Sequence, residues 1–271
     1  MGILTGEVAL VTGGGRGFGR AIAERLAAEG AAVALVARSA EQIGEAAAVI
    51  GARGGTAIPV TGDVTDPASV AAAVAQVEER LGAVSLLVSN AGVPGPFGPL
   101  WEVDPDAWWQ AQAVHIRAPM LLLHRVLPGM IARGQGRAIC VSARAARIVA
   151  PYMSAYCTGK IALNRVVAEA AAELAGTGVS AFAIDPGFVF TELARQTSED
   201  QAAQRYLGGM MSRLRERAND PAGADDLARC AQRCVDLASG RYDALSGGYF
   251  ELPDDLDALL AARAAPSSNS D

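Results

Sequence analysis

The feature that most constrains the fold of this chain is a glycine-rich turn between a predicted strand and a predicted helix. Residues 7–12 (EVALVT) form an apolar, β-branched run that is typical of a buried strand. The run leads directly into GGGRGFG at 13–19, and an alanine-rich amphipathic pattern follows to Glu29. Glycines let a backbone approach a pyrophosphate closely, and a helix N-terminus offers it free N–H groups. The N-terminal segment therefore predicts a dinucleotide-binding unit.

Strand and helix patterns alternate along the rest of the chain, which predicts an α/β fold. Further strand runs are at 32–37, 56–60, 84–88, 138–141, 179–184 and 249–252, and the main helical patterns are at 67–81, 104–133, 155–175 and 224–238. We find no repeat and no interdomain linker. We therefore expect one domain at 1–253, with a substrate lid at about 190–220, followed by a C-terminal helix and disordered tail at 254–271.

Composition and charge exclude several kinds of partner. The net charge is −6 and the pI is near 5.1, whereas phosphate-backbone binding requires a basic face. No apolar run approaches the roughly 18 residues that span a bilayer, and no signal peptide is recognisable. Cys230 and Cys234 lie one helical turn apart without a nearby His or acidic cluster, so no metal site is expected. We expect a cytoplasmic protein that binds small molecules, not nucleic acid or membranes.

The second strand ends where a nucleotide ribose would lie. An NAD site usually has an acid at this position, to bind the ribose 2′-hydroxyl. Here Ala37 is followed by Arg38 and Ser39, and Arg16 lies in the glycine turn. Two guanidinium groups favour a 2′-phosphate, and hence NADP(H) over NAD(H). The alternative is that both arginines are simply solvated.

Tyr156 and Lys160 lie four residues apart on a predicted helix, so their side chains share a face. A phenol acts as an acid or base near neutral pH only when its pKa lies well below about 10, and a nearby ammonium shifts it in that direction. Lys160 is the only lysine in the chain. The pair predicts a proton-transfer site, although a solvated helix face with a chance pair is the alternative.

Taken together, these landmarks resemble the short-chain dehydrogenase/reductase family over about 7–252. The matching motifs are TGGGRGFG at 12–19, Asp63, SNAG at 89–92, YCTGK at 156–160 and DPGFVFT at 185–191. The resemblance implies a single-domain Rossmann-type fold, a doubly wound seven-stranded parallel sheet with helices on both faces. It also implies NAD(P)-linked oxidoreduction of a carbonyl or alcohol, and a homodimer or homotetramer.

The resemblance also implies roles for individual residues. Tyr156 would be the general acid, and Lys160 would lower its pKa and bind the nicotinamide ribose. The expected cofactor-binding residues are Gly13, Gly15, Arg16, Gly17, Phe18, Gly19, Arg38, Ser39, Asp63, Val64, Asn90, Ala91, Gly92, Tyr156, Lys160, Pro186, Gly187, Val189 and Thr191.

Two positions depart from the family pattern. The family has a serine thirteen residues before the tyrosine, where this chain has Ala143. Ser142 precedes it, and it can substitute only if the strand end bulges or slips by one residue, because successive strand residues face opposite ways. His115 replaces the usual asparagine, and its imidazole can conduct protons or simply fill a helix gap. We therefore include His115 and Ser142 among the candidate catalytic residues.

Three functions remain open at this point. The first is an NADP(H)-dependent oxidoreductase acting on a small, largely apolar carbonyl or alcohol. The second uses the same fold for cyclisation, dehydration or isomerisation, as Ala143 and His115 would permit. The third is a non-catalytic cofactor-binding subunit, which the intact Tyr156 and Lys160 pair argues against.

Overall fold

The computed structural model describes residues 2–264 apart from 219 and 221. Its strands are β1 (Val8–Thr12), β2 (Ala32–Ala37), β3 (Thr56–Thr61), β4 (Leu86–Ser89), β5 (Gly136–Val141), β6 (Val179–Ile184) and β7 (Tyr249–Phe250). They form one parallel sheet in the order β3-β2-β1-β4-β5-β6-β7. The predicted seven-stranded doubly wound fold is therefore confirmed. The predicted disordered tail beyond 264 lies outside the described residues.

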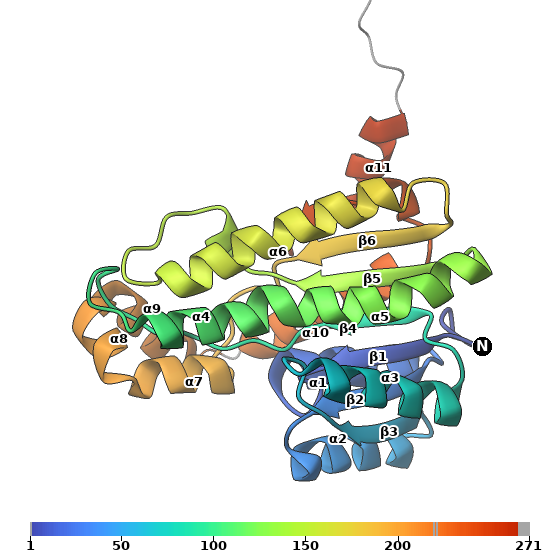
Figure 1. Ribbon diagram of the computed structural model, residues 1–271, viewed down its shortest axis with the longest axis horizontal. Helices are drawn as coiled ribbons and strands as arrows, with labels where there is room; N and C mark the ends of the chain where they lie inside the picture. Colours follow the sequence, from blue (N-terminus) through green and yellow to red (C-terminus); the bar gives the residue numbers. More distant parts are fainter. Residues whose placement is uncertain (1, 219, 221, 265–271) are drawn as a thin grey trace, which may run out of the picture.

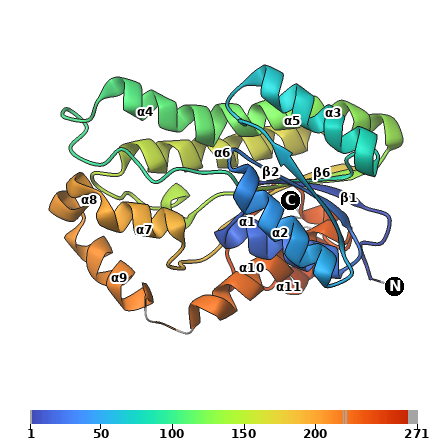
Figure 2. The same cartoon turned by 90° about the horizontal axis from the view of Figure 1, so that it is seen from below.

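Helices cover both faces of this sheet (Figure 1; Figure 2). One face carries α3 (Pro67–Leu81), α5 (Ala118–Arg133) and α6 (Ser154–Glu173), and the other carries α1 (Gly17–Ala28), α2 (Ala40–Ala52), α10 (Ala222–Ala238) and α11 (Leu256–Ala264). Neighbouring residues of β1 face opposite layers: Leu10 packs in the α3 layer, and Val11 packs in the α1 layer. Burial on both faces explains why the strands are continuous apolar runs.

The helical pattern predicted at 104–133 is divided in the structure. It comprises α4 (Pro105–Gln112), a π-helical turn η1 (Ala113–Arg117) and α5. Pro119 has no N–H to bond the carbonyl of residue 115, so the regular hydrogen-bond ladder cannot pass this point. The irregular turn places His115 beside α6, which packs against η1.

Three short helices lie beyond the carboxyl ends of the strands, at the left of Figure 1. They are α7 (Glu192–Glu199), α8 (Gln201–Tyr206) and α9 (Gly208–Ala218). They pack through a third apolar cluster, separate from the two sheet cores, that includes Met153, Cys157, Leu207 and Met211. This segment corresponds to the predicted substrate lid. None of the helices in the described residues is suited by length and hydropathy to cross a bilayer.

Candidate active site

The glycine turn lies at the carboxyl end of β1, where ligands bind in open α/β sheets. Gly13 has φ +63, a conformation that side chains disfavour. At Gly19 an added Cβ would lie only 2.2 Å from the carbonyl oxygen of Gly13, so helix and turn can approach this closely only without a side chain. The predicted glycines thus form a tight connection between β1 and α1.

The first turn of α1 offers its N–H groups to an anion. Arg16 is the N-cap residue and makes no side-chain capping bond, and the first turn contains no acid. Phe18, in the same turn, is half-buried against the core. Uncapped N–H groups and the positive end of the helix dipole fit a phosphate group.

Asn90 joins the ends of β1 and β4 beneath this turn. Its Nδ2 donates to the carbonyl oxygen of Thr12 at 3.0 Å, while the backbone N–H groups of Asn90 and Ala91 donate to the Thr12 hydroxyl at 2.9 and 3.2 Å. Gly92 lies close to the ring of His115. The predicted SNAG segment is therefore a structural support of the glycine turn.

The residues predicted to bind the adenosine part of the cofactor follow the carboxyl ends of β2 and β3. Arg38 is exposed, and Ser39 caps α2 by accepting from the N–H of Gln42 at 3.3 Å. Asp63 accepts from the N–H and hydroxyl of Thr65 at 2.9 and 2.7 Å. These bonds, and the charge of Arg38, lower the pKa of Asp63. The site is therefore cationic at Arg38 and keeps Asp63 ionised.

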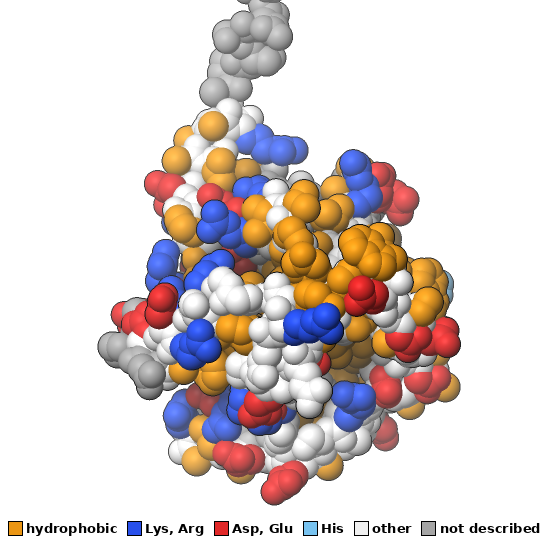
Figure 3. All heavy atoms as spheres, turned by 90° about the vertical axis from the view of Figure 1, so that its left-hand side faces the viewer, with side chains coloured by type: hydrophobic (Ala, Val, Ile, Leu, Met, Phe, Trp, Pro, Cys, Tyr) orange, Lys and Arg blue, Asp and Glu red, His pale blue; other side chains and the backbone are white. Residues whose placement is uncertain are grey.

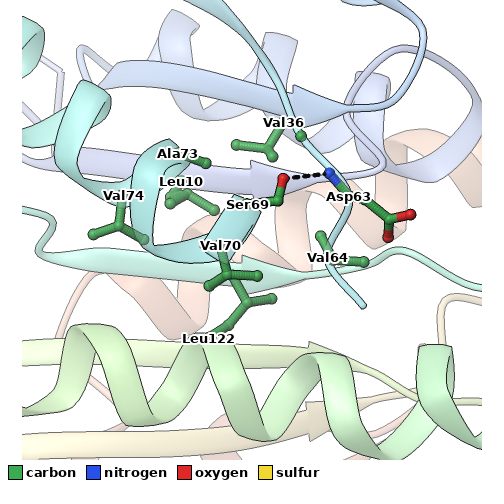
Figure 4. Close-up of a pocket in the computed structure, with 10 residues that line it drawn as sticks. Leu10, Val36, Asp63, Val64, Ser69, Val70, Ala73, Val74 and Leu122 are labelled. Carbon is green, nitrogen blue, oxygen red and sulfur yellow. Dashed lines mark hydrogen bonds between the residues drawn. The ribbon is translucent and has the colours of Figure 1, made fainter. Parts of the chain in front are cut away.

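A small cavity lies behind this edge, between β1, β2 and α3 (Figure 4). Its volume is about 10 Å³, which is at the lower limit for one water molecule. Val64 lines it, while the Asp63 carboxylate points away from it (Figure 4). The cavity is too small for a nucleobase, so an adenine could only lie outside it.

Tyr156 and Lys160 lie on one face of α6, as predicted. Lys160 is only 4% exposed, its Nζ donates to the carbonyl of Val141 at 2.8 Å, and this Nζ lies 5.7 Å from the centroid of the Tyr156 ring. Burial lowers the pKa of Lys160 to about 8, against opposing effects of Cys140 and Asp185. The only lysine of the chain is therefore a buried ammonium near its titration point at neutral pH.

The expected lowering of the Tyr156 pKa is wrong for this structure. Its pKa is raised, first by burial and then by the charges of Asp185 and Cys157. Tyr156 is half-buried and packs against the apolar lid cluster. Desolvation disfavours phenolate, and Lys160 bonds a backbone carbonyl instead of the phenol. The phenol is therefore protonated at neutral pH.

Ser142 does not replace the missing serine in this arrangement. Its N–H continues the strand ladder to the carbonyl of Ile184 at 2.7 Å, and Ala143 is extended, so the strand end neither bulges nor slips. The Ser142 side chain is 2% exposed, and its hydroxyl donates to the carbonyl of Lys160 at 3.4 Å. Because side chains alternate between the two faces of a strand, the Ser142 hydroxyl lies against α6.

His115 contacts Tyr156 directly. The two rings meet edge to face, with centroids 5.3 Å apart, and Nε2 lies 3.0 Å from the carbonyl oxygen of Val93. Because a carbonyl only accepts, Nε2 carries the proton and Nδ1 is left as an acceptor. Burial, together with the charge of Lys160, lowers the pKa of His115 to about 3. The imidazole is therefore neutral.

The loop after β6 runs from Pro186 to the start of α7. The Asp185 carboxylate accepts from the N–H of Gly187 at 3.3 Å, and the N–H of Thr191 donates to Val189 at 2.8 Å. Thr191 lies beside Gly17, because a Cβ added there would be 3.4 Å from its methyl group. Of the predicted loop residues, Thr191 therefore lies next to the glycine turn.

Two residues of this site were not predicted. Gln112 is 3% exposed, and its Nε2 donates to the carbonyls of Trp108 and Ala155 at 3.3 and 3.0 Å. Glu192 forms an ion pair with Arg16 at 3.5 Å. A glutamine on a helix and an acid next to an arginine are common sequence features. Only the fold, which places Gln112 against α6 and Glu192 against the glycine turn, distinguishes them.

Tyr156 packs against an apolar cluster formed by side chains of the 190–220 segment and of the loops before α4 and α6. Phe97, Met153 and Met211 belong to this cluster, with Phe188 and Phe190 packed against it. Hydrophobic side chains also gather on the outer surface of this end of the molecule (Figure 3), where Trp101 and Val149 are 84% and 93% exposed. The surroundings of Tyr156 are therefore apolar.

Comparison with known proteins gives consistent matches over most of the chain. Residues 7–202 match the family model of short chain dehydrogenases. A short chain dehydrogenase from Pseudocercospora fijiensis is 37% identical over 262 residues, covering 96% of this chain and 84% of that protein. A gluconate 5-dehydrogenase from Burkholderia cenocepacia, solved in complex with NADP and tartrate, has a TM-score of 0.77 at 30% identity and covers 92% of this chain and 94% of its own. A metagenomic short-chain oxidoreductase in complex with NADP has a TM-score of 0.66 at 37% identity, covering 69% and 85%.

Proposed function

Because the chain belongs to the short-chain dehydrogenase/reductase family, we propose that it is an NADP(H)-dependent oxidoreductase that interconverts a small, largely apolar carbonyl compound and its alcohol. The observation that carries this proposal is the position of Tyr156, a protonated phenol beneath an apolar lid and beside a buried ammonium. When bound, the nicotinamide cofactor supplies or accepts the hydride.

Tyr156 is the proton donor in the reductive direction. Its raised pKa keeps it protonated at neutral pH, and the developing alkoxide, which is a stronger base than phenolate, can still take this proton although the phenol is a weaker acid than expected. The positive charge of Lys160 stabilises the phenolate that remains after transfer. The proton is then replaced from solvent, for which the pKa of Lys160, about 8, is suitable. We propose that neutral His115 fixes the Tyr156 ring and offers Nδ1 as an acceptor on this path.

The substrate oxygen has one donor fewer than in the usual family site, since Ala143 has no hydroxyl. Losing one preorganised donor costs roughly 10²–10³ in rate. The hydroxyl of Ser154, which accepts from the Trp108 indole at 3.1 Å, still has a proton to donate. Reduction by Tyr156 therefore remains feasible at a lowered rate.

The preference for NADP(H) rests on charge at the adenosine end. Arg16 and Arg38 provide two guanidinium groups, and Ala37 provides no acid to repel a phosphate or bind a free ribose hydroxyl. Structural neighbours solved with NADP support this assignment.

The test is to mix the protein with NADPH and a panel of apolar ketones and follow nicotinamide absorbance. We expect turnover that Tyr156→Phe abolishes and that Ala143→Ser increases or leaves unchanged. Retained activity in Tyr156→Phe would contradict the proposal.

A second candidate function is a non-redox proton transfer, such as dehydration or isomerisation. The observation that favours it is Ala143 at the family's serine position, combined with a buried neutral His115 in contact with Tyr156. Product formation without any change in the nicotinamide redox state would identify this chemistry.

We also propose a homo-oligomer. Helices α4, α5 and α6 expose Trp109, Met120 and Ile161 at 67%, 50% and 51%, and we propose that these side chains are covered by a second copy of the chain. Sedimentation of the purified protein should give a dimer or tetramer, and replacing these three side chains by glutamine should give a monomer.

A further inference from the structure

The lid begins directly against the glycine turn. Arg16 Nη1 lies 3.5 Å from Glu192 Oε1, and the side chains are 49% and 24% exposed. Thr191, the preceding residue, lies beside Gly17. The first acid of α7 is therefore paired with the basic residue of the loop proposed to bind the cofactor phosphates.

Glu192 is held in place by a second arginine. Arg195 donates to both of its carboxylate oxygens, from Nε at 2.6 Å and from Nη2, and Gln196 donates to Oε1 at 3.3 Å. Arg195 is the main cause of the lowered pKa of Glu192, and Arg16 contributes less. Glu192 therefore stays ionised and fixed when Arg16 moves away, so Arg16 is the mobile partner of the pair.

We propose that Glu192 moderates the preference for NADP(H) by competing with its 2′-phosphate for Arg16. This inference rests on the proposed function, which assigns Arg16 to that phosphate. A phosphate monoester carries more charge and more acceptor oxygens than a carboxylate, so the guanidinium of Arg16 binds the phosphate more strongly than it binds Glu192. The exchange still breaks an existing ion pair. Glu192 therefore weakens the binding of NADP(H) but not of NAD(H), which has no 2′-phosphate to exchange.

The expected size of the effect follows from the exposure of the pair. Half-exposed ion pairs contribute little, which corresponds to a change of about two- to fivefold in a dissociation constant. Glu192→Gln removes the carboxylate charge and keeps the shape of the side chain. We expect it to tighten NADPH binding about two- to fivefold and to leave NADH binding unchanged.

The experiment measures dissociation constants of NADPH and NADH by isothermal titration calorimetry, without substrate. The matched control is Glu199→Gln, because Glu199 binds Arg195 at 2.6 and 2.7 Å but makes no contact with Arg16. We expect the control to bind both nucleotides like wild type. Unchanged NADPH binding in Glu192→Gln would overturn the inference. Weaker binding of both nucleotides would also overturn it, because that result means that the ion pair clamps the bound cofactor.

Arg16→Ala separates this inference from the proposed function. If Arg16 binds the phosphate, Arg16→Ala weakens NADPH binding, and adding Glu192→Gln to it changes nothing further. If Arg16→Ala has no effect on NADPH, the assignment of Arg16 under the proposed function fails. If it weakens NADPH binding while Glu192→Gln alone has no effect, only the competition by Glu192 fails.

Discussion

Replacing Gly159 by alanine tests the contact between α6 and the π-helical turn that carries His115. A Cβ at this position would lie 2.6 Å from the Cβ of His115 and 3.0 Å from the Gln112 Oε1. The His115 Cβ is attached to the backbone and cannot rotate away, so the helix and η1 must separate. His115 can occupy this position only because residue 159 has no side chain.

The change in the free energy of unfolding caused by Gly159→Ala combines two opposing effects. Alanine in a helix interior is favoured over glycine by about 0.5–1 kcal/mol, whereas overpacking a close contact costs about 1–3 kcal/mol. We expect Gly159→Ala to lower the free energy of unfolding by up to about 2 kcal/mol. Gly44→Ala is the matched control, because a Cβ at this α2 position meets nothing within 4 Å. It should be stabilising by about 0.5–1 kcal/mol.

The assay is equilibrium unfolding in urea, together with turnover. The two variants should differ by about 1–3 kcal/mol, which isolates the contact at residue 159. Turnover should fall about tenfold to a hundredfold in Gly159→Ala, because the displaced imidazole moves the Tyr156 ring that it contacts. Equal stabilisation in both variants, with normal turnover, would refute the tight contact.

Three further predictions address protonation, cofactor choice and the support of the glycine turn. Because Tyr156 stays protonated while Lys160 loses its charge at a pKa of about 8, the rate of reduction should stay constant from neutral pH up to that pKa and fall above it, while alcohol oxidation, which needs phenolate, should rise relative to reduction; a reduction rate that does not change as the pH passes the Lys160 pKa would contradict this assignment. Arg38→Ala should weaken NADPH binding more than NADH binding, and equal affinities that the substitution leaves unchanged would exclude the NADP(H) preference. Thr12→Val should destabilise the protein by about 1–3 kcal/mol, because two backbone N–H groups, those of Asn90 and Ala91, lose their acceptor; an unfolding midpoint like that of wild type would show that these bonds contribute nothing.

The architecture was predictable because the chain repeats one local pattern. Each buried strand reads as an apolar run, and the glycine turn requires conformations and close contacts that few other residues permit, as Gly13 and Gly19 show. The Tyr156 and Lys160 spacing likewise places both side chains on one helix face. These features depend on residues that are near each other in sequence.

The properties that depend on burial were not predictable in the same way. The sign of the Tyr156 pKa shift is set by burial, and the apolar cluster around Tyr156 includes residues of α7, α8 and α9, about which the spacing within α6 contains no information. The orientation of the Ser142 side chain depends on the register at the end of β5. The hydrogen bond from the Ser142 N–H to the Ile184 carbonyl keeps that register regular. The Arg16 and Glu192 pair joins the glycine turn to the start of α7, which only the fold brings together.

The apolar cluster under α7, α8 and α9 shares no buried residue with either sheet core. We therefore expect these hydrophobic contacts to open at a free energy below that of global unfolding. Amide hydrogens of the three short helices should exchange sooner than those of the central strands. Substitutions that change the lid to accept other substrates would then alter its opening without lowering the denaturation temperature of the seven-stranded sheet and the helices that cover it.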